Sequence, residues 1–435
     1  MYGTVPTILY ALFRSVSGRP TVEKFLLSLS CLSAVSELIR RVLFATKQFP
    51  VMSEISEVVP KIIAKVFSDV PEPFKEFNIN IKLLENSRSF WSECYQVLVS
   101  ANSEKYKENV VSPLFVKIPR ISAINAALDA ENAEENNEIL RTLTAQEVQF
   151  YKDFARFEFA SFPLPRFFYG ESLENEEMAG LVCQDFSGIA GSIDFIPGFS
   201  ESQVLQLLDA LAGFHSKTVK ISAEVPWEHY SNALYSQEYI RMLYNDSLQF
   251  EEMCPNELSG RIQDVKHIFD EDGVRNSNEL NEQLGLPFVL CHNDLNASNV
   301  LWNKETGRIQ AMIDFQHVAK GAVSFDIIRI LCLGLSVKNR RDNTVRFLQH
   351  YYDSFKAHNS DTVPFSFNQL LLSYSAHFNF VNATTVFSLT YYYKMYTDTS
   401  LDLKDDVATK TKKAEEILSR AIGILDDVRS MERGI

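Results

Sequence analysis

The sequence predicts an α+β protein in which a smaller, strand-rich lobe precedes a larger, mainly helical lobe. Two observations predict this order. Runs of β-prone residues gather between about residues 78 and 184, and apolar residues recur at three- and four-residue spacing from about residue 200 onwards. The chain has 435 residues, which is enough for two or three domains of ordinary size. A cleft between two such lobes would be a natural place for a ligand.

The composition is that of a folded, acidic protein. Hydrophobic residues make up 46% of the chain and charged residues 23%, which excludes wholesale disorder. The 42 basic and 56 acidic residues give a net charge of −14, so the chain repels nucleic-acid phosphates and anionic lipid at long range. We therefore expect no nucleic-acid partner, and a membrane partner is disfavoured.

The cysteines and histidines give no sign of a disulfide framework or a zinc site. The six cysteines lie far apart, none forms a CxxC pair, and the histidines form no HExxH motif. Several cysteines lie in apolar contexts, which is typical of reduced core thiols. This pattern predicts a reducing, cytoplasmic location. The cysteines are Cys31, Cys94, Cys183, Cys254, Cys291 and Cys332.

Residues 1–75 are predicted to form a helical extension that ends near Pro71 and Pro73. Within it, Phe25–Val35 is a continuous apolar run preceded and followed by charged residues. A membrane span needs roughly 20 residues, so the run favours an amphipathic surface helix. A signal sequence or membrane anchor stays open as the alternative, and either would make the protein secreted or lumenal.

The strand-rich lobe is predicted to span residues 76–186. Residues 94–99 and 114–118 are β-prone runs separated by a charged polar connection. Residues 144–157 switch to helical spacing, and Thr144 with Glu147 forms a capping-box pattern that predicts where this helix begins. Residues 181–184 read as another strand, followed by a glycine-containing turn.

The larger lobe is predicted to span residues 187–435. Two apolar stripes at three- and four-residue spacing predict buried helices, one at residues 204–214 and one at residues 414–428. A third stretch, rich in aromatic residues, favours packing core over the wall of a pocket for a cationic or steroid-like acceptor. Its aromatic residues are Tyr374, Phe378, Phe380, Phe387 and Tyr391–Tyr393.

One segment carries the candidate chemistry. It contains His292, Asp294 and Asn299 in the order His-x-Asp-x4-Asn, and an apolar strand that ends in Asp314 follows. The turn residues at 304–308 predict a short hairpin between the flanking β-prone runs. That hairpin would bring Asp314 back to the neighbourhood of Asn299.

Phosphoryl transfer explains why these residue types belong together. A carboxylate at Asp294 can orient a substrate hydroxyl and accept its proton, while His292 holds the loop by hydrogen bonding. Asn299 and Asp314 supply oxygen ligands for Mg²⁺, which neutralises charge on the phosphates of ATP. The alternative is that these polar residues only satisfy their own loop backbone. The hairpin and the aspartate at the strand end favour the functional interpretation.

This segment resembles the Brenner-type phosphotransferase motif of the protein-kinase-like superfamily. It is most similar to the nematode branch of the CHK kinase-like (ecdysteroid/choline kinase-like) family, and the likeness continues through residues 324–329, 335–341 and 365–374. It covers roughly residues 75–430. The resemblance implies a bilobal protein-kinase-like fold, ATP and Mg²⁺ as cofactors, and a small-molecule alcohol as acceptor. Choline and steroid alcohols both fit, and the oligomeric state is left open.

The resemblance assigns further residues upstream of the motif. Lys117 resembles the strand lysine that contacts the nucleotide phosphates; the alternative is a lysine on an edge strand that reaches water. Glu147 matches the helix glutamate that pairs with this lysine, with Glu138 and Glu135 as lesser candidates. Gln184–Phe186 falls where the family has its interlobe hinge, although Asp185 is equally explained as a turn residue.

The resemblance also gives Asp326 a role as an anchor of the catalytic loop, with simple helix capping as the alternative. Two departures from the family pattern keep a second function open. Ser87–Ser92 stands where the family has a glycine-containing turn over the phosphates, and Asn293 replaces a glycine beside the catalytic aspartate. The second function is a catalytically weak or inactive kinase-like protein that binds or regulates.

Overall fold

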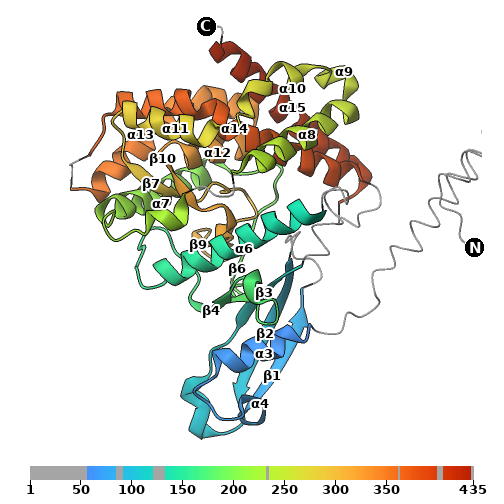
Figure 1. Ribbon diagram of the computed structural model, residues 1–435, viewed down its shortest axis with the longest axis vertical. Helices are drawn as coiled ribbons and strands as arrows, with labels where there is room; N and C mark the ends of the chain where they lie inside the picture. The colour runs from blue at the N-terminus through green and yellow to red at the C-terminus, as the bar shows by residue number, and fades with distance from the viewer. Residues whose placement is uncertain are drawn as a thin grey trace, which may run out of the picture. The chain divides into compact units, whose positions relative to one another are not determined.

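The computed structural model describes residues 56–84, 92–120, 133–231, 235–360, 363–398 and 405–432 (Figure 1). A β-sheet precedes a mainly helical region, so the predicted α+β class is confirmed. Both belong to one compact unit, Glu57–Ile435. The predictions for Phe25–Val35, the loop at residues 87–91 and the side chain of Glu135 fall outside the described residues. The predicted boundaries at residues 75 and 186 stay predictions.

The sheet has five strands in the order β1-β2-β3-β5-β4, and every neighbouring pair is antiparallel. The predicted strands at 94–99, 114–118 and 181–184 are confirmed, and β1 and β4 complete the sheet. Helices α3 (Val58–Val66) and α4 (Pro73–Glu76) precede it, and α3 buries Val59, Ile62 and Ile63 in a cluster with apolar side chains of the sheet. The strands are β1 (Phe77–Leu83), β2 (Ser92–Ala101), β3 (Leu114–Pro119), β4 (Phe167–Glu171) and β5 (Gly180–Gln184).

Helix α6 (Ala133–Phe154) lies between the sheet and the C-terminal helices (Figure 1). It begins eleven residues before Thr144, so the predicted capping box at Thr144 is wrong. The Thr144 hydroxyl instead donates to the carbonyl oxygen of Leu140 at 2.8 Å, one turn back along the helix. Glu147 therefore lies within a continuous helix, and its carboxylate is available to a partner outside that helix.

The C-terminal region is built on long helices, and both predicted apolar stripes lie on them. Helix α7 (Glu201–Lys220) begins with a capping box made by Ser200 and Gln203, and α12 (Phe325–Gly334) is buried along its whole length. Within the described ranges, no helix has the length and apolar character needed to cross a bilayer. The other helices are α8 (Gln237–Met253), α9 (Pro255–Leu258), α10 (Arg261–Asp264), α11 (Gly273–Gln283), α13 (Val337–His358), α14 (Phe367–Thr397) and α15 (Val407–Glu432).

Two small antiparallel sheets present the candidate site. The predicted hairpin is confirmed: β8 (Val300–Asn303) pairs with β9 (Ile309–Met312), and the left-handed Gly307 completes the turn between them. The short β6 (Ala190–Gly191) adds to β8. Strand β7 (Phe288–Cys291) pairs with β10 (Ala319–Ala322), so the candidate loop leaves β7 and enters β8.

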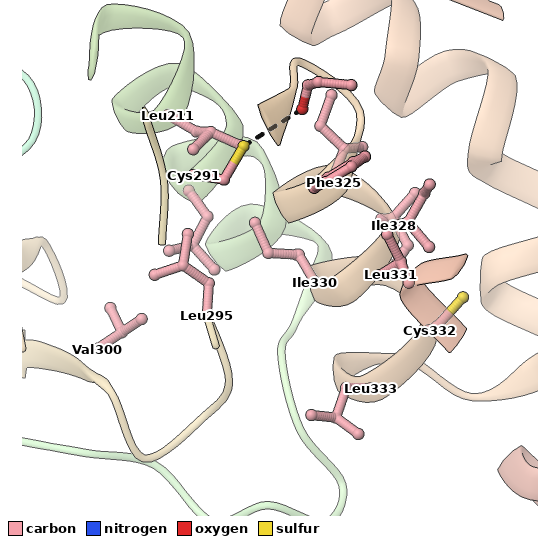
Figure 2. Packing of buried hydrophobic residues seen from close by; sticks show 14 of the residues in the cluster. Leu211, Cys291, Leu295, Val300, Phe325, Ile328, Ile330, Leu331, Cys332 and Leu333 are labelled. Carbon is pink, nitrogen blue, oxygen red and sulfur yellow. Dashed lines mark hydrogen bonds between the residues drawn. The ribbon is translucent and has the colours of Figure 1, made fainter. Parts of the chain in front are cut away.

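The main core surrounds α12. Figure 2 shows Leu211 of α7, Cys291 at the end of β7 and the apolar side chains of α12 packed together, with the Cys291 thiol hydrogen-bonded to the carbonyl of Ala322 at 3.3 Å. All five cysteines of the described part of the chain are free and buried, as the sequence predicts. The candidate loop therefore leaves β7 from a rigidly packed position.

Phe315, directly after Asp314, ties the candidate site to α6. Its ring stacks on Phe150 with centroids 3.9 Å apart and meets Tyr151 edge-on at 5.7 Å. Phe315 is fully buried. This aromatic contact fixes the backbone that carries Asp314.

Replacing Phe315 with alanine should lower the free energy of unfolding by about 3–5 kcal/mol, because the ring is fully buried and the helix cannot close over the space. Urea titration would measure the loss. Leu372→Ala on α14 is the matched control, since Leu372 is 55% exposed, and should change stability by less than about 0.5 kcal/mol. Similar losses for the two variants would contradict the assigned packing role.

Candidate functional site

Lys117 lies in the middle of the sheet, between Cys94 of β2 and Leu181 of β5. The edge-strand interpretation is therefore wrong. Its ammonium Nζ lies 2.8 Å from Oε2 of Glu147 and 3.1 Å from Oδ1 of Asp314. Glu147 is thus the partner on α6, whereas Glu138 is exposed and makes no such contact. A lysine from the sheet joins a carboxylate from α6 to one that follows β9.

Burial determines the electrostatics of this triad. Burial alone would lower the pKa of Lys117, but the Asp314 and Glu147 carboxylates outweigh it and hold that pKa above its ordinary value. Burial raises the pKa of Glu147, although the neighbouring Lys117 ammonium favours its ionised form. The ammonium is therefore a fixed positive charge at any physiological pH.

Asp314 reaches Lys117 because the backbone turns sharply after β9. Its φ of 68° and ψ of 69° are left-handed, a conformation that is uncommon for residues other than glycine and that Asp and Asn adopt more readily than most. The preceding Ile313 N–H donates to the carbonyl of Asn299 at 3.0 Å. This bond brings Asp314 beside Asn299, as the hairpin predicted.

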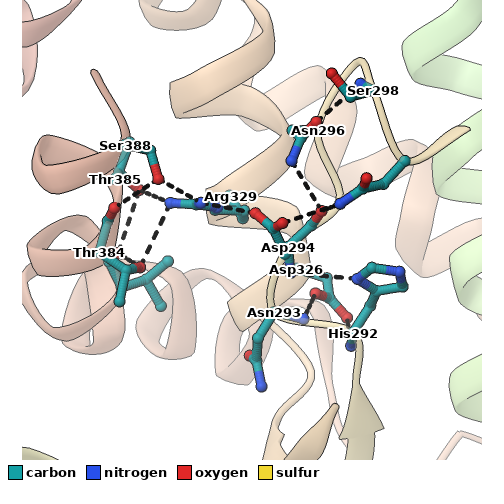
Figure 3. Close-up of polar contacts among 12 residues, drawn as sticks. His292, Asn293, Asp294, Asn296, Ser298, Asp326, Arg329, Thr384, Thr385 and Ser388 are labelled. Atoms are coloured by element: carbon teal, nitrogen blue, oxygen red, sulfur yellow. Dashed lines mark hydrogen bonds and ion pairs between the residues drawn. The ribbon is translucent and has the colours of Figure 1, made fainter. Parts of the chain in front are cut away.

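Asp294 is held by two neighbours, one on each carboxylate oxygen (Figure 3). Arg329 of α12 donates to Oδ1 at 2.8 Å, and the side-chain amide of Asn299 donates to Oδ2 at 2.9 Å. Burial would raise the pKa of Asp294, but the Arg329 guanidinium, together with the nearby His317 and His292, outweighs it and lowers that pKa below the ordinary value. Asp294 is therefore ionised and fixed in orientation at neutral pH.

The side chain of Asp326 anchors the loop that carries Asp294. This fully buried carboxylate of α12 accepts the backbone N–H groups of His292 at 2.8 Å and Asn293 at 2.7 Å. The helix-capping alternative for Asp326 is therefore wrong, and the anchoring role is confirmed. A carboxylate bonded to two backbone amides fixes the loop before any ligand arrives.

His292 fixes the loop by hydrogen bonding, as expected from the sequence. Its Nδ1 accepts the N–H of Asp294 at 3.3 Å, so Nε2 carries the proton and donates to the carbonyl of Ile313 at 3.0 Å. Asn293, which replaces the family's glycine, has a left-handed φ of 61° and donates from its side chain to the carbonyl of His317 at 3.0 Å. The substitution is accommodated locally.

Arg329 is the site residue that the sequence analysis missed. It lies within residues 324–329, one of the segments that resemble the family, but the sequence pattern indicated no role for it. An available signal was an arginine inside helix α12, which is apolar apart from Asp326, because a buried guanidinium requires a carboxylate partner.

A cavity of about 450 Å³ lies against these groups. Lys117, Glu147, Asn299 and Asp314 line it at one side, and Gln184–Phe186 line it where β5 ends. The Asp185 carboxylate accepts hydrogen bonds from the Gln96 side chain at 2.6 Å and from the Ser187 N–H at 2.9 Å. The second bond is the one expected of a turn residue. The other lining residues are Leu84, Cys94, Phe115, Tyr151, Pro165, Leu181, Cys183, Ser187, Ala190, Gly191, Ser192, Ser298, Leu301, Lys304 and Ile313.

The donor set of Asn299 and Asp314 fits a hard divalent cation. Both residues line the cavity, and both offer oxygen atoms, the ligand type that Mg²⁺ prefers. The Asn299 amide nitrogen already donates to the carbonyl and the carboxylate of Asp294, both at 2.9 Å. Its oxygen is therefore the atom left for a ligand.

The aromatic stretch on α14 is mainly packing core, as favoured from the sequence. Tyr374 and Phe378 are buried. Phe380 differs, because it lines a small pocket of about 10 Å³ together with Arg329 and Asn293. Part of the stretch thus lies beside the candidate loop.

Comparison with known proteins places this geometry in a family. A family model described as "Uncharacterized oxidoreductase dhs-27" (DUF1679) matches residues 113–433. An uncharacterized kinase-like protein of Caenorhabditis elegans is 70% identical over 377 residues, which cover 87% of this chain and 100% of that protein. The C. elegans protein described as oxidoreductase dhs-27 is 22% identical over 69% of this chain, but the match covers only 38% of that relative. The oxidoreductase description therefore belongs to a protein that lies mostly outside the match.

Solved structures of small-molecule kinases are also similar to this chain. The ethanolamine kinase of Plasmodium vivax has a TM-score of 0.42 and 14% identity, covering 89% of this chain and 94% of its own. Choline kinase LicA of Streptococcus pneumoniae has a TM-score of 0.36 and 14% identity, covering 83% of this chain and 99% of its own.

The Arg329–Asp294 pair predicts a pH dependence. In the wild type, the lowered pKa means that ionised Asp294 stabilises the folded state above about pH 4, and this contribution is lost as pH falls through the lower folded-state pKa. In Arg329→Met, burial still raises that pKa while the largest opposing contribution is gone, so the stabilisation that ionised Asp294 provides at neutral pH becomes smaller.

The gap in melting temperature between wild type and Arg329→Met should therefore widen from pH 3 to pH 7. Lys338→Met is the control, because Lys338 and Asp342 form an exposed pair, and its gap should stay nearly flat. A gap for Arg329→Met that does not change with pH would contradict the assigned ion pair.

Proposed function

The chain belongs to the DUF1679 family, together with the kinase-like protein of C. elegans to which it is 70% identical. On this premise we propose that it is an ATP-dependent phosphotransferase acting on the hydroxyl group of a small molecule. One observation carries the proposal. A central-strand lysine, a helix glutamate and the aspartate after β9 converge at 2.8 and 3.1 Å on the wall of a 450 Å³ cavity. Such a triad suits a nucleotide whose phosphates need a fixed cation.

Each group then has a distinct part. ATP occupies the cavity, with its adenine near Gln184–Phe186 and the apolar patch that Phe186 and Ala190 form with Ala311. Lys117 binds the phosphates, and Glu147 holds the ammonium in place. Asn299 and Asp314 hold Mg²⁺, which when bound neutralises phosphate charge.

Asp294 faces the acceptor. Its ionised carboxylate orients the acceptor hydroxyl and takes its proton as the oxygen attacks the terminal phosphorus of ATP. The bond from that phosphorus to the bridging oxygen breaks, and ADP leaves with the electron pair. Because Arg329 lowers the pKa of Asp294, alignment of the hydroxyl contributes more than basicity.

A catalytically weak or inactive binding protein is the second candidate. It is favoured by the sequence Ser87–Ser92, which contains no glycine where the family has a glycine-containing turn. We propose a small-molecule alcohol as the substrate and expect no nucleic-acid partner. A cytoplasmic location accords with the free, buried cysteines at the five described positions.

ATP with Mg²⁺ should raise the melting temperature, and ATP without metal should raise it less. A ligand at a hundredfold excess over its Kd stabilises the folded state by about 2.7 kcal/mol. Thermal denaturation with and without EDTA would measure both shifts. No shift at millimolar ATP–Mg²⁺ would count against the phosphotransferase and favour a kinase-like protein that has lost nucleotide binding.

Mutagenesis should distinguish the role of Asp314 from that of Asp294. Asp314→Asn removes a charged metal ligand and should weaken the Mg²⁺-dependent part of ATP binding. Asp294→Asn should leave ATP affinity within a few-fold and lower turnover by about 10²–10⁴. Calorimetry and single-turnover assays would measure these effects; ATP binding abolished by Asp294→Asn but spared by Asp314→Asn would reverse the assignment.

A further inference from the structure

Arg329 pairs with Asp294, the carboxylate that we propose faces the acceptor. It does not line the large cavity; it lines the separate small pocket with Asn293, Phe325 and Phe380. Its side chain is only 5% exposed, so the guanidinium is a buried charge. A group that binds Asp294 through its hydroxyl would meet this guanidinium next.

The contacts of Arg329 leave it one free donor. One terminal nitrogen donates to Asp294 and to the Ser388 hydroxyl, both at 2.8 Å. The other donates to the hydroxyls of Thr385 at 3.3 Å and Thr384 at 3.4 Å (Figure 3). The Nε–H has no partner among the residues that the structure describes. An unpaired buried donor beside a small pocket favours a ligand or water that offers an oxygen atom.

Each of the three carboxylates around the loop already has a partner, although Asp294 keeps lone pairs for the acceptor hydroxyl. Asp294 has one bond on each oxygen, Asp326 accepts two backbone amides, and Asp314 pairs with Lys117. In the described part of the chain, none of these three is left to balance a cationic acceptor. An ammonium group entering here would lie close to the Arg329 guanidinium, and the one carboxylate beside it, Asp294, is already neutralised by that guanidinium.

The rest of the small pocket is uncharged. Tyr235, Phe325, Phe380 and Val381 line it, and the Phe380 ring packs on Phe325 and Tyr235 with centroids 5.3 and 5.7 Å away. The pocket volume of about 10 Å³ is that of a water-sized group. An anionic acceptor would face Asp294 and the phosphates of ATP, so the surroundings favour an acceptor without charge.

We propose that Arg329 is a specificity-determining residue that restricts the acceptor to uncharged alcohols. This inference rests on the proposed phosphotransferase function and deepens it. The guanidinium excludes cationic alcohols by like-charge repulsion in a buried setting, while its Nε–H is available to an oxygen of a neutral acceptor. Arg329 also orients Asp294, so its substitution affects turnover as well as selectivity.

The test compares acceptors that differ in charge and little else. Purified full-length protein is incubated with Mg²⁺ and γ-labelled ATP and with three separate pools of cationic, neutral and anionic alcohols. The cationic pool contains choline and ethanolamine. The neutral pool contains dimethylbutanol, in which a quaternary carbon replaces the nitrogen of choline, together with aliphatic and steroid alcohols; the anionic pool contains hydroxy acids. Labelled product is expected in the neutral pool, and kcat/KM for dimethylbutanol should exceed that for choline at least about 10-fold.

Variants test whether Arg329 causes the preference. In Arg329→Met the ratio between the matched neutral and cationic acceptors should fall to within about threefold, whereas Arg329→Lys keeps the charge and should keep the preference. Arg346→Met, which removes an exposed arginine paired with Glu201, should leave the ratio unchanged. A role in orienting Asp294 alone would change kcat for both acceptors equally and leave the ratio intact.

The outcomes distinguish a failure of the role proposed for Arg329 from a failure of the phosphotransferase function on which it rests. A wild-type kcat/KM that is as high for a cationic or anionic alcohol as for the matched neutral one, or an unchanged ratio in Arg329→Met, overturns the role of Arg329 and leaves the phosphotransferase function standing. No product from any pool, with ATP–Mg²⁺ still raising the melting temperature, overturns the phosphotransferase function and the inference that rests on it. Should Arg329→Met fail to fold, the three pools with the wild-type protein still test whether the acceptor is uncharged.

Discussion

The buried ammonium of Lys117 is the constraint on which the rest of the candidate site depends. A charge in the centre of a sheet is strongly unfavourable unless carboxylates surround it. The partners come from two other parts of the chain, Glu147 on α6 and Asp314 after β9, at 2.8 and 3.1 Å. Satisfying one lysine therefore joins the sheet to α6 and to the β8–β9 hairpin. The same requirement that stabilises the charge also assembles a site suited to phosphate.

A second buried ion, Asp326, organises the other half of the site. Its oxygens are bonded to the backbone of His292 and Asn293, which fixes the loop against the core helix α12. Arg329, one turn further along α12, reaches Asp294 from the same helix. Because α12 is buried along its whole length, small movements of the loop would require repacking of the core. The loop is thus preorganised, which is the condition under which an orienting carboxylate is effective.

Several features of the site followed from the sequence because they are local. The hairpin depends on turn residues within one short segment, and its closure at Ile313 brings Asp314 to Asn299. Strands β2, β3 and β5 were predicted from runs of β-prone residues. The start of α6 was predicted wrongly because a Thr-x-x-Glu pattern also occurs inside helices, where the hydroxyl bonds one turn back, as Thr144 does with Leu140.

The sequence by itself determined the order of strands and helices and the residues of the candidate loop, because periodicity, turn chemistry and motif spacing act over short distances. Tertiary structure alone decided that Lys117 lies on a central strand and not an edge, that Glu147 and not Glu138 faces it, and that Arg329 neutralises Asp294. These outcomes depend on which side chains are buried together, and burial determines whether a charge needs a partner. Residues 35 positions apart, such as Asp294 and Arg329, acquire that relation only when the chain has folded.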